Sequence, residues 1–351
     1  MLRDAVTISG EDRRRVDRIC DKLIMKVKTS YKYRLYRNIV RVVYPLILIA
    51  LFYAIVHKRD FSFSQKEEAR LIGASYMTMN NEFFKIINEQ IRVRVEAEGD
   101  MIILRDPGLD VARQNQQIEE MLDMGISALI VTPVDIDGLT DVLRRAKAMG
   151  VYVIVVDSNI SDETLTDCTI VSDNYNAGTI IGNYVLDKQE GGKIIVFTHE
   201  ATASGSNRVA GFIDTVAGHP GYEVLDQIEC EGQYEIAMPR MLEYLDEGHD
   251  FDTVFCLNDL AAAGVVAALK TKDLAGKVNV YGVDASPDAK SLIDEGLMRA
   301  SAVQFPTRIG ERAASVLYDI FEGKDTEKTI IVPVDIVSTE NIDSYNKERW
   351  Q

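Results

Sequence analysis

The sequence has few cysteines, and their positions argue against disulfide, redox and metal chemistry. Only four stand among 351 residues, at Cys20, Cys168, Cys230 and Cys256. None has a close partner or the spacing of a metal site. Cys256 lies inside an apolar run, where a thiol usually packs as a small hydrophobic group. We therefore expect free, mostly buried thiols, no metal ion and no other cofactor.

Common catalytic and nucleotide-binding motifs are also missing. The segment Ser204-Gly205-Ser206 lacks the Gly-x-Ser-x-Gly pattern of a nucleophile elbow, and Gly178 to Gly182 is not a Gly-x-Gly-x-x-Gly loop after a strand. Four histidines, at positions 57, 199, 219 and 249, have no partner at motif spacing. These absences predict a protein that is not an enzyme.

Positive charge is scarce outside the N-terminal part. Residues 1–41 hold 12 Lys and Arg against 5 Asp and Glu, which leaves 27 against 50 in the remainder. An acidic body repels nucleic-acid phosphates and anionic lipids, so no nucleic-acid partner is expected. The length suits two lobes with an appendage, and 46% apolar with 27% charged residues is ordinary for a globular protein.

One long apolar run, Ile39 to Val56, is interrupted only by Arg41 and Pro45. Basic residues stand at its start, at Arg34, Arg37 and Arg41, and an acidic body follows it. This charge asymmetry predicts a single membrane span with a cytoplasmic N-terminus and an extracytoplasmic body. A buried core helix is the alternative. A cleaved signal peptide is disfavoured, because the preceding basic region is too long and no small-x-small site follows the run.

Beyond Leu71, short apolar runs alternate with helical patterns. Nearly continuous apolar strands indicate burial on both faces, which is typical of a parallel sheet covered by helices. Because two such series cannot share one core, we predict an α/β fold with two doubly wound parallel-sheet lobes, a hinge and a cleft between the lobes. The predicted domains are a basic cytoplasmic head (1–38), a transmembrane signal anchor (39–56), a tether (57–69), lobe 1 (70–172 and 305–335) and lobe 2 (173–304 and 336–351).

Polar or aromatic residues follow several of these apolar runs at the point where each run stops. They are Asn80, Asn81, Phe83 and Phe84 after the first run, then Asp157, Asn258, Asp259, Asp284 and Gln304, with Arg208 in a turn. Ligands of open parallel sheets bind outside the carboxyl ends of the strands, so these residues are expected to converge. Carboxylates, carboxamides, a guanidinium and phenyl rings suit a neutral, hydroxyl-rich ligand, which favours a monosaccharide. The alternatives are that Asn81 and Asn258 only cap helices and that Phe84 is core.

The same region resembles the type I periplasmic-binding-protein family, in particular its ribose and monosaccharide-binding branch. The resemblance covers about residues 70–342 and rests on ordered motifs: Met79-Asn80-Asn81-Glu82-Phe83-Phe84, Thr132-Pro133-Val134-Asp135, Val156-Asp157, Ser172-Asp173-Asn174, Asn207-Arg208-Val209-Ala210-Gly211-Phe212, Val254-Phe255-Cys256-Leu257-Asn258-Asp259, Tyr281-Gly282-Val283-Asp284-Ala285-Ser286-Pro287-Asp288 and Gln304-Phe305-Pro306. It implies three crossings between the lobes, near Ser172-Asp173, Gln304-Phe305 and Asp335-Ile336. It also implies sugar contacts at Asn81, Phe83, Asp157, Arg208, Asn258, Asp284 and Gln304.

The chain departs from the ribose-binding pattern at two positions. Ser158 stands where the pattern has Arg, and Met77 stands where it has a small hydroxyl residue. The missing guanidinium suggests a sugar whose ring size or stereochemistry differs from that of ribose. The aromatic wall of the second lobe has no clean match, and Tyr234 is its nearest candidate.

Several functions remain open at this stage. The resemblance favours a membrane-anchored binding protein that delivers a pentose or hexose to an ABC-type importer. The alternative is a receptor that presents its sugar-bound state to a sensor histidine kinase. A hydrolase built on the strand-end carboxylates is a more distant alternative. A repressor of the lactose-repressor family is another, although an apolar span between head and body does not fit that architecture.

Overall fold

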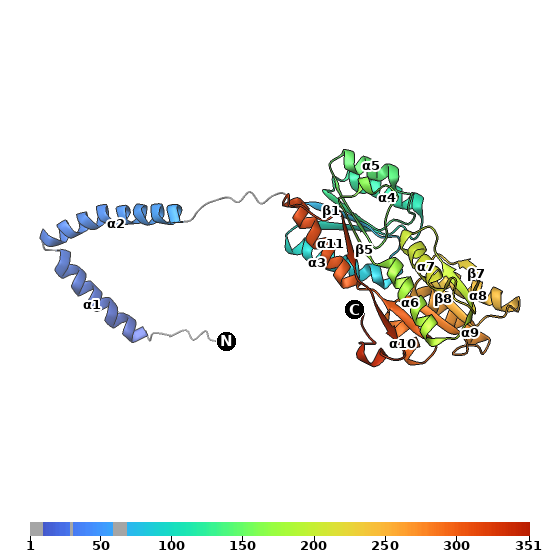
Figure 1. The fold of residues 1–351 in the computed structure, drawn as a ribbon. Helices are drawn as coiled ribbons and strands as arrows, with labels where there is room; N and C mark the ends of the chain where they lie inside the picture. Colours follow the sequence, from blue (N-terminus) through green and yellow to red (C-terminus); the bar gives the residue numbers. More distant parts are fainter. Residues whose placement is uncertain (1–9, 29–30, 59–68) are drawn as a thin grey trace. The chain divides into compact units, whose positions relative to one another are not determined.

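The structure is a computed structural model that describes residues 10–28, 31–58 and 69–351. Its contacts divide the chain into two units, residues 1–68 and 69–351. The first unit contains α1 (Gly10–Lys28) and α2 (Tyr31–Lys58), both labelled in Figure 1.

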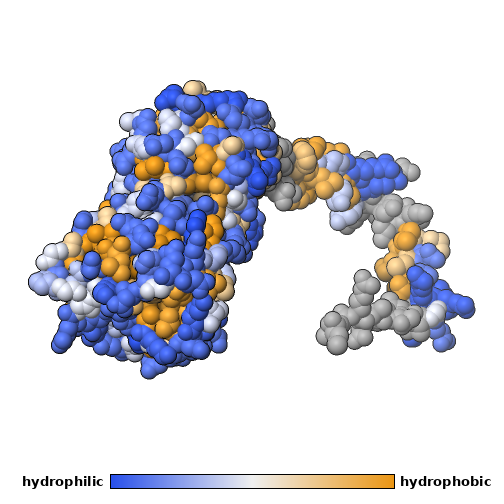
Figure 2. Space-filling view, turned by 90° about the vertical axis from the view of Figure 1, so that its right-hand side faces the viewer, coloured by the Kyte–Doolittle hydropathy of each residue, from blue (hydrophilic) through white to orange (hydrophobic). Residues whose placement is uncertain are grey.

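Helix α2 presents apolar side chains to its surroundings on every face. Leu46, Ile47, Leu48 and Ile49 are consecutive and each is about half exposed or more. Figure 2 shows hydrophobic surface, in orange, on part of the first unit. Consecutive positions point in different directions around a helix, so the apolar surface is not confined to one stripe. Among the residues that the structure describes, no helix is long and apolar enough to cross a membrane.

The second unit contains two six-stranded sheets (Figure 1). The first has the order β11-β5-β4-β3-β1-β2 and consists of β1 (Leu71–Ser75), β2 (Met101–Arg105), β3 (Ala128–Val131), β4 (Tyr152–Val156), β5 (Cys168–Ser172) and β11 (Thr329–Val332). The second has the order β12-β10-β9-β8-β6-β7 and consists of β6 (Gly192–Thr198), β7 (Tyr222–Glu229), β8 (Thr253–Cys256), β9 (Asn279–Asp284), β10 (Ala300–Val303) and β12 (Asp335–Ser338). We call the parts of the molecule built on these sheets lobe 1 and lobe 2.

The predicted α/β class is confirmed, with one departure. All strands of the first sheet pair in parallel, but β12 pairs with β10 in antiparallel fashion, Ala300 lying opposite Ser338. The chain has only a short connection between β11 and β12, so β12 enters lobe 2 at the sheet edge in the reverse direction. Central strands such as β3 and β8 are buried at every residue, as their unbroken apolar runs predict.

Helices cover both faces of each sheet. They are α3 (Glu82–Ala97), α4 (Val111–Asp123), α5 (Thr140–Ala148), α6 (Asn174–Lys188), α7 (Ala203–Val216), α8 (Tyr234–Asp246), α9 (Asp259–Thr271), α10 (Pro287–Asp294) and α11 (Pro306–Phe321), with short 3-10 turns at Glu163–Leu165 and Ile342–Ser344. Helices α3 and α11 lie side by side on lobe 1 (Figure 1), and a Cβ at Gly310 would overlap the backbone of Ile87. The described residues form three apolar clusters: one in lobe 2, one between the first sheet and helices α3 and α11, and one between that sheet and helices α4 and α5.

The last residues of the chain, which the prediction places in lobe 2, contact both lobes. Lys290 on α10 is fully buried and its Nζ donates to the carbonyl oxygens of Asn346, at 2.6 Å, and Arg349. One residue further, Trp350 reaches lobe 1. Its ring lies 5.8 Å from that of Phe83 and its Nε1 donates to Glu82 at 3.3 Å. The last residues therefore connect the lobes, in addition to the three chain crossings between the sheets.

Candidate ligand-binding site between the lobes

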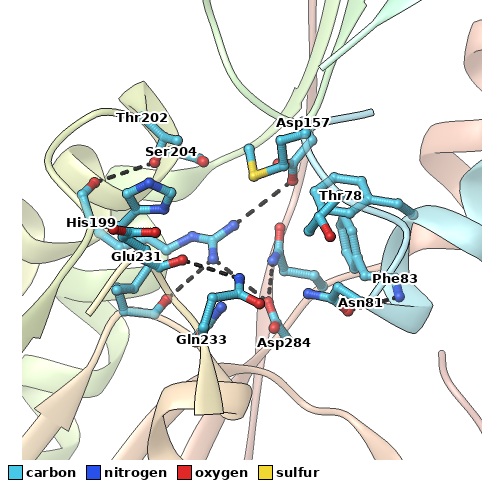
Figure 3. A pocket seen from close by; sticks show the side chains of 16 residues that line it. Thr78, Asn81, Phe83, Asp157, His199, Thr202, Ser204, Glu231, Gln233 and Asp284 are labelled. Carbon is cyan, nitrogen blue, oxygen red and sulfur yellow. Dashed lines mark hydrogen bonds and ion pairs between the residues drawn. The ribbon is translucent and has the colours of Figure 1, made fainter. Parts of the chain in front are cut away.

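A cavity of about 430 Å³, which includes open space at its mouth, lies between the carboxyl ends of the two sheets. Its lining comes from both lobes: Met77, Thr78, Asn81, Phe83, Phe84, Asp157, His199, Thr202, Ser204, Arg208, Glu231, Gln233, Leu257, Asn258, Asp284 and Gln304. Figure 3 shows Asp157 and Asp284 on opposite sides of the cavity, with Phe83 and Asn81 toward one end and His199 and Glu231 toward the other.

Arg208 is held near the centre of the site by the close approach of α6 and α7. A Cβ at Gly178 on α6 would overlap the carbonyl oxygen of Arg208 on α7, so only glycine permits this distance. The Arg208 Nε donates to Asn174 Oδ1 at 2.8 Å, and one terminal nitrogen donates to the carbonyl of Leu257 at 3.1 Å. With 4% of its surface exposed, the guanidinium is fixed before any ligand arrives.

Two buried aspartates flank this guanidinium. The closest oxygen-to-nitrogen distances are 3.9 Å for Asp157 and 3.6 Å for Asp284, too long for strong hydrogen bonds. Both residues have positive φ angles, 70° and 128°, at the turns that follow β4 and end β9. This backbone conformation is costly for residues other than glycine, and such strain often marks functional sites.

Burial governs the ionisation of both carboxylates. It raises the pKa of Asp157 to about 6, and the charge of Arg208 opposes that rise. The pKa of Asp284 is likewise raised to about 6 by burial, while Arg208 and a 2.6 Å hydrogen bond from Gln304 Nε2 oppose it. Asp157 Oδ1 and Gln304 Oε1 are buried and accept no hydrogen bond from the described residues. A ligand that brings donors to these oxygens would satisfy them.

The two asparagines both cap helices and line the cavity. Asn81 Oδ1 accepts from the amide of Phe83 at the start of α3, and Asn258 Oδ1 accepts from the amide of Ala261 at the start of α9. Asn258 Nδ2 also donates to the carbonyl of Gly232 at 2.9 Å, so both ends of its amide are bonded within the protein. Helix capping and cavity lining are alternative roles for these asparagines in the sequence analysis, whereas in the structure each asparagine has both.

Phe83 and Phe84 form the aromatic wall. Their rings meet edge to face at 5.5 Å, and Phe84 also stacks near Tyr76 at 6.0 Å within the core of lobe 1. Phe83 is held from behind by Trp350. Rings packed this tightly offer a rigid apolar surface to the C–H groups of a ligand.

The lobes touch at the rim of the cavity. The amide of Ser204 in lobe 2 donates to Ser158 Oγ in lobe 1 at 3.2 Å, and the amide of Ile136 donates to the carbonyl of Ala201 at 3.0 Å. These contacts make the structure a closed form. Ser158 therefore has a role of its own at the interface between the lobes.

Eight of the nine predicted site residues line this cavity, and Tyr234 does not. Its ring is 36% exposed and lines a separate surface groove with Leu260, while its hydroxyl contacts the sulfur of Met238. The structure thus places Tyr234 outside the cavity, because this residue is the first of α8 and its side chain points outward. Gln233, the preceding residue, is the one that enters the cavity.

The sequence interpretation also missed several lining residues. His199 directly follows β6 and Glu231 follows β7 by two positions, so the rule that located Asp157 would have located both had it been applied to those strands. Thr202 and Ser204 belong to the turn and first residues of α7 and carry no comparable pattern. Only the folded chain identifies them.

The unit has two α/β lobes, and polar and aromatic side chains line a buried cavity where the strand ends of the two lobes face each other. This arrangement is typical of a protein that encloses a small polar ligand. The match of a family model agrees: the chain belongs to the periplasmic binding protein domain family, whose model matches residues 72–325. The chain is thus a binding protein rather than an enzyme.

Curated relatives and solved structures resemble most of the chain. The ribose import binding protein RbsB of Bacillus subtilis is 27% identical over 75% of this chain and 85% of its own length. The protein of the same name from Escherichia coli is 27% identical over 74% and 86%. An ABC transporter solute binding protein from Mycobacterium smegmatis, solved with bound glycerol, has a TM-score of 0.74 and 26% identity, and covers 79% of this chain and 96% of its own.

Proposed function

We propose that this protein binds a monosaccharide, a pentose or a hexose, outside the cytoplasm and delivers it to an ABC-type importer. The observation that carries the proposal is the cavity, in which Asp157, Asp284 and Arg208 surround a space bounded by Phe83. Carboxylates accept from sugar hydroxyls, a guanidinium donates to them, and an aromatic ring packs on the C–H face. Relatives named for ribose import support the same reading.

Ligand binding is tested by thermal denaturation of the full-length chain with a panel of pentoses and hexoses. A bound sugar raises the melting temperature, and the stabilisation grows with concentration as RT ln(1 + [L]/Kd). Branched-chain amino acids serve as the control class, because the site pairs one guanidinium with several carboxylates and amides. Stabilisation by those amino acids and by no sugar would contradict the proposal.

Closure of the two lobes over the ligand would let a membrane partner distinguish the ligand-bound protein from the free protein. A ligand that touches both lobes shifts the hinge equilibrium only by its preference for the closed form. The rim contact between Ser204 and Ser158 joins the two lobes in the closed form, whose surface a permease would recognise. Loss of uptake of the labelled sugar in cells that lack this protein would support delivery to an importer. Intact uptake with loss of sugar-induced gene expression would favour the alternative, a receptor for a sensor histidine kinase.

We further propose that Ile39 to Val56 anchors the protein in the cell membrane, with the basic head inside and the binding unit outside. No helix among the described residues qualifies as a membrane span, so the proposal rests on the apolar run in the sequence and the arginines before it, together with the exposed apolar side chains of α2. Protease added to intact cells should digest the binding unit but spare a tag placed before Met1. Recovery of the whole binding unit from the medium, starting after Val56, would overturn the anchor.

A further inference from the structure

Five charged side chains are buried in and directly behind the cavity. They are Asp157, Asp259, Asp284, Arg208 and Lys290, each at most 4% exposed. Asp259 does not line the cavity. It accepts from Ser301 Oγ at 2.7 Å and from the Ser286 amide at 2.8 Å, and its charge acts on that of Lys290. Lys290 does not line the cavity either, so the charged side chains in the lining that are buried are two carboxylates and one guanidinium.

Arg208 does not neutralise both of these carboxylates. Two of its nitrogens are used by Asn174 and Leu257, and its distances to Asp157 and Asp284 exceed hydrogen-bond length. Asp284 has a compensating hydrogen bond from Gln304, whereas Asp157 Oδ1 is buried and accepts none from the described residues. The uncompensated negative charge therefore lies on the Asp157 side of the cavity.

Neighbouring groups at the mouth do not provide the missing positive charge. Burial lowers the pKa of His199, which disfavours the charged form of its ring. Glu231 is exposed at the same edge and adds a further negative charge, while Glu229 is engaged by Thr198 and by the amide of Glu200. A ligand entering this site thus meets a field that favours cations.

We infer that the natural ligand is an amino sugar or another polyol of similar size whose protonated primary amine pairs with Asp157. The inference rests on the proposed function, because it specifies the class of sugar for the same cavity. Buried charges in proteins are paired and hydrogen-bonded, and an ammonium brings three donors with its charge. Hydroxyl groups of the same ligand would be held by Asp284 and Arg208, and its apolar face by Phe83.

The test is isothermal titration calorimetry of the full-length chain at pH 7 with matched sets of monosaccharides. Each ring position is offered with a hydroxyl, an amino or an acetamido group, for example D-glucose, D-glucosamine and N-acetyl-D-glucosamine. We expect at least one amine to bind 10-fold or more tightly than both neutral members of its set. Equal or tighter binding of the hydroxyl member in every set would overturn the inference and leave the proposed function intact. Binding of no member would overturn both.

The variant Asp157→Asn identifies the carboxylate responsible. Its side chain has the same shape without the charge, so the preference for the amine should fall to about 3-fold or less while the neutral member still binds. Asp137→Asn is the matched control, because Asp137 is exposed in the same lobe and does not line the cavity. Retention of the full preference in Asp157→Asn would place the ammonium elsewhere and contradict the inference.

Discussion

Replacing Asp284 by asparagine should weaken ligand binding and at the same time stabilise the ligand-free protein. The two side chains have the same shape, and Gln304 can still donate to an oxygen at this position. What is lost is the charge that accepts from ligand hydroxyls. Hydrogen bonds to charged groups contribute about 1.5 to 3 kcal/mol, so affinity for the best sugar of the panel should fall about 10-fold to 100-fold.

The stability effect has the opposite sign because burial raises the pKa of Asp284 to about 6 from an ordinary value of 3.8. A carboxyl group with a raised folded-state pKa holds its proton more tightly when folded, so its contribution to stability falls as pH rises from about 4 to about 6. With about 1.36 kcal/mol per pKa unit, the ionised aspartate costs the closed form about 3 kcal/mol at pH 7.5. Asparagine avoids that cost.

The assay is urea denaturation of both proteins without ligand at pH 7.5 and pH 4.5, with calorimetry for affinity. The variant should be more stable by up to about 3 kcal/mol at pH 7.5 and by only about 1 kcal/mol at pH 4.5, where the folded wild type is already protonated. Asp288→Asn, four residues further and exposed on α10, should change neither quantity by more than about 0.5 kcal/mol. A variant that is less stable at pH 7.5 and binds with unchanged affinity would refute the reasoning.

Three further predictions concern the supports of the site. Arg208→Met should lower the free energy of unfolding, measured with urea at pH 7.5, by about 3 to 5 kcal/mol, because two buried carboxylates lose their counter-charge. A change below about 1 kcal/mol would show that these carboxylates are not ionised. Gly178→Ala should lower the free energy of unfolding by about 1 to 3 kcal/mol, because the new Cβ would overlap the Arg208 carbonyl. Gly10→Ala is the control and should not change this free energy measurably, because no atom lies within 4 Å of its new Cβ. Equal effects of the two substitutions would contradict the close approach of α6 and α7. Trp350 is the single tryptophan and contacts Phe83, so its fluorescence should change when ligand binds. Trp350→Ala should weaken ligand binding about 3-fold to 10-fold. Unchanged emission and unchanged affinity would show that the C-terminal segment does not contribute to the site.

The sequence by itself determined the fold class and most of the cavity. Unbroken apolar runs such as Ala128 to Val131 required burial on both faces, and parallel sheets place the ends of such runs at one edge. Asp157, Asp284 and Gln304 were found for that reason alone. The same rule would have found His199.

Only the tertiary structure decided how these side chains are oriented and paired. Tyr234 and Gln233 are neighbours, yet the start of α8 turns one outward and the other into the cavity. The contact of Trp350 with Phe83 joins residues 267 positions apart, and no periodicity encodes it. The net charge of the cavity also depends on the tertiary structure. The guanidinium of Arg208 can compensate one aspartate or two, and which of these holds depends on distances of a few ångströms and on the exclusion of water around the three groups.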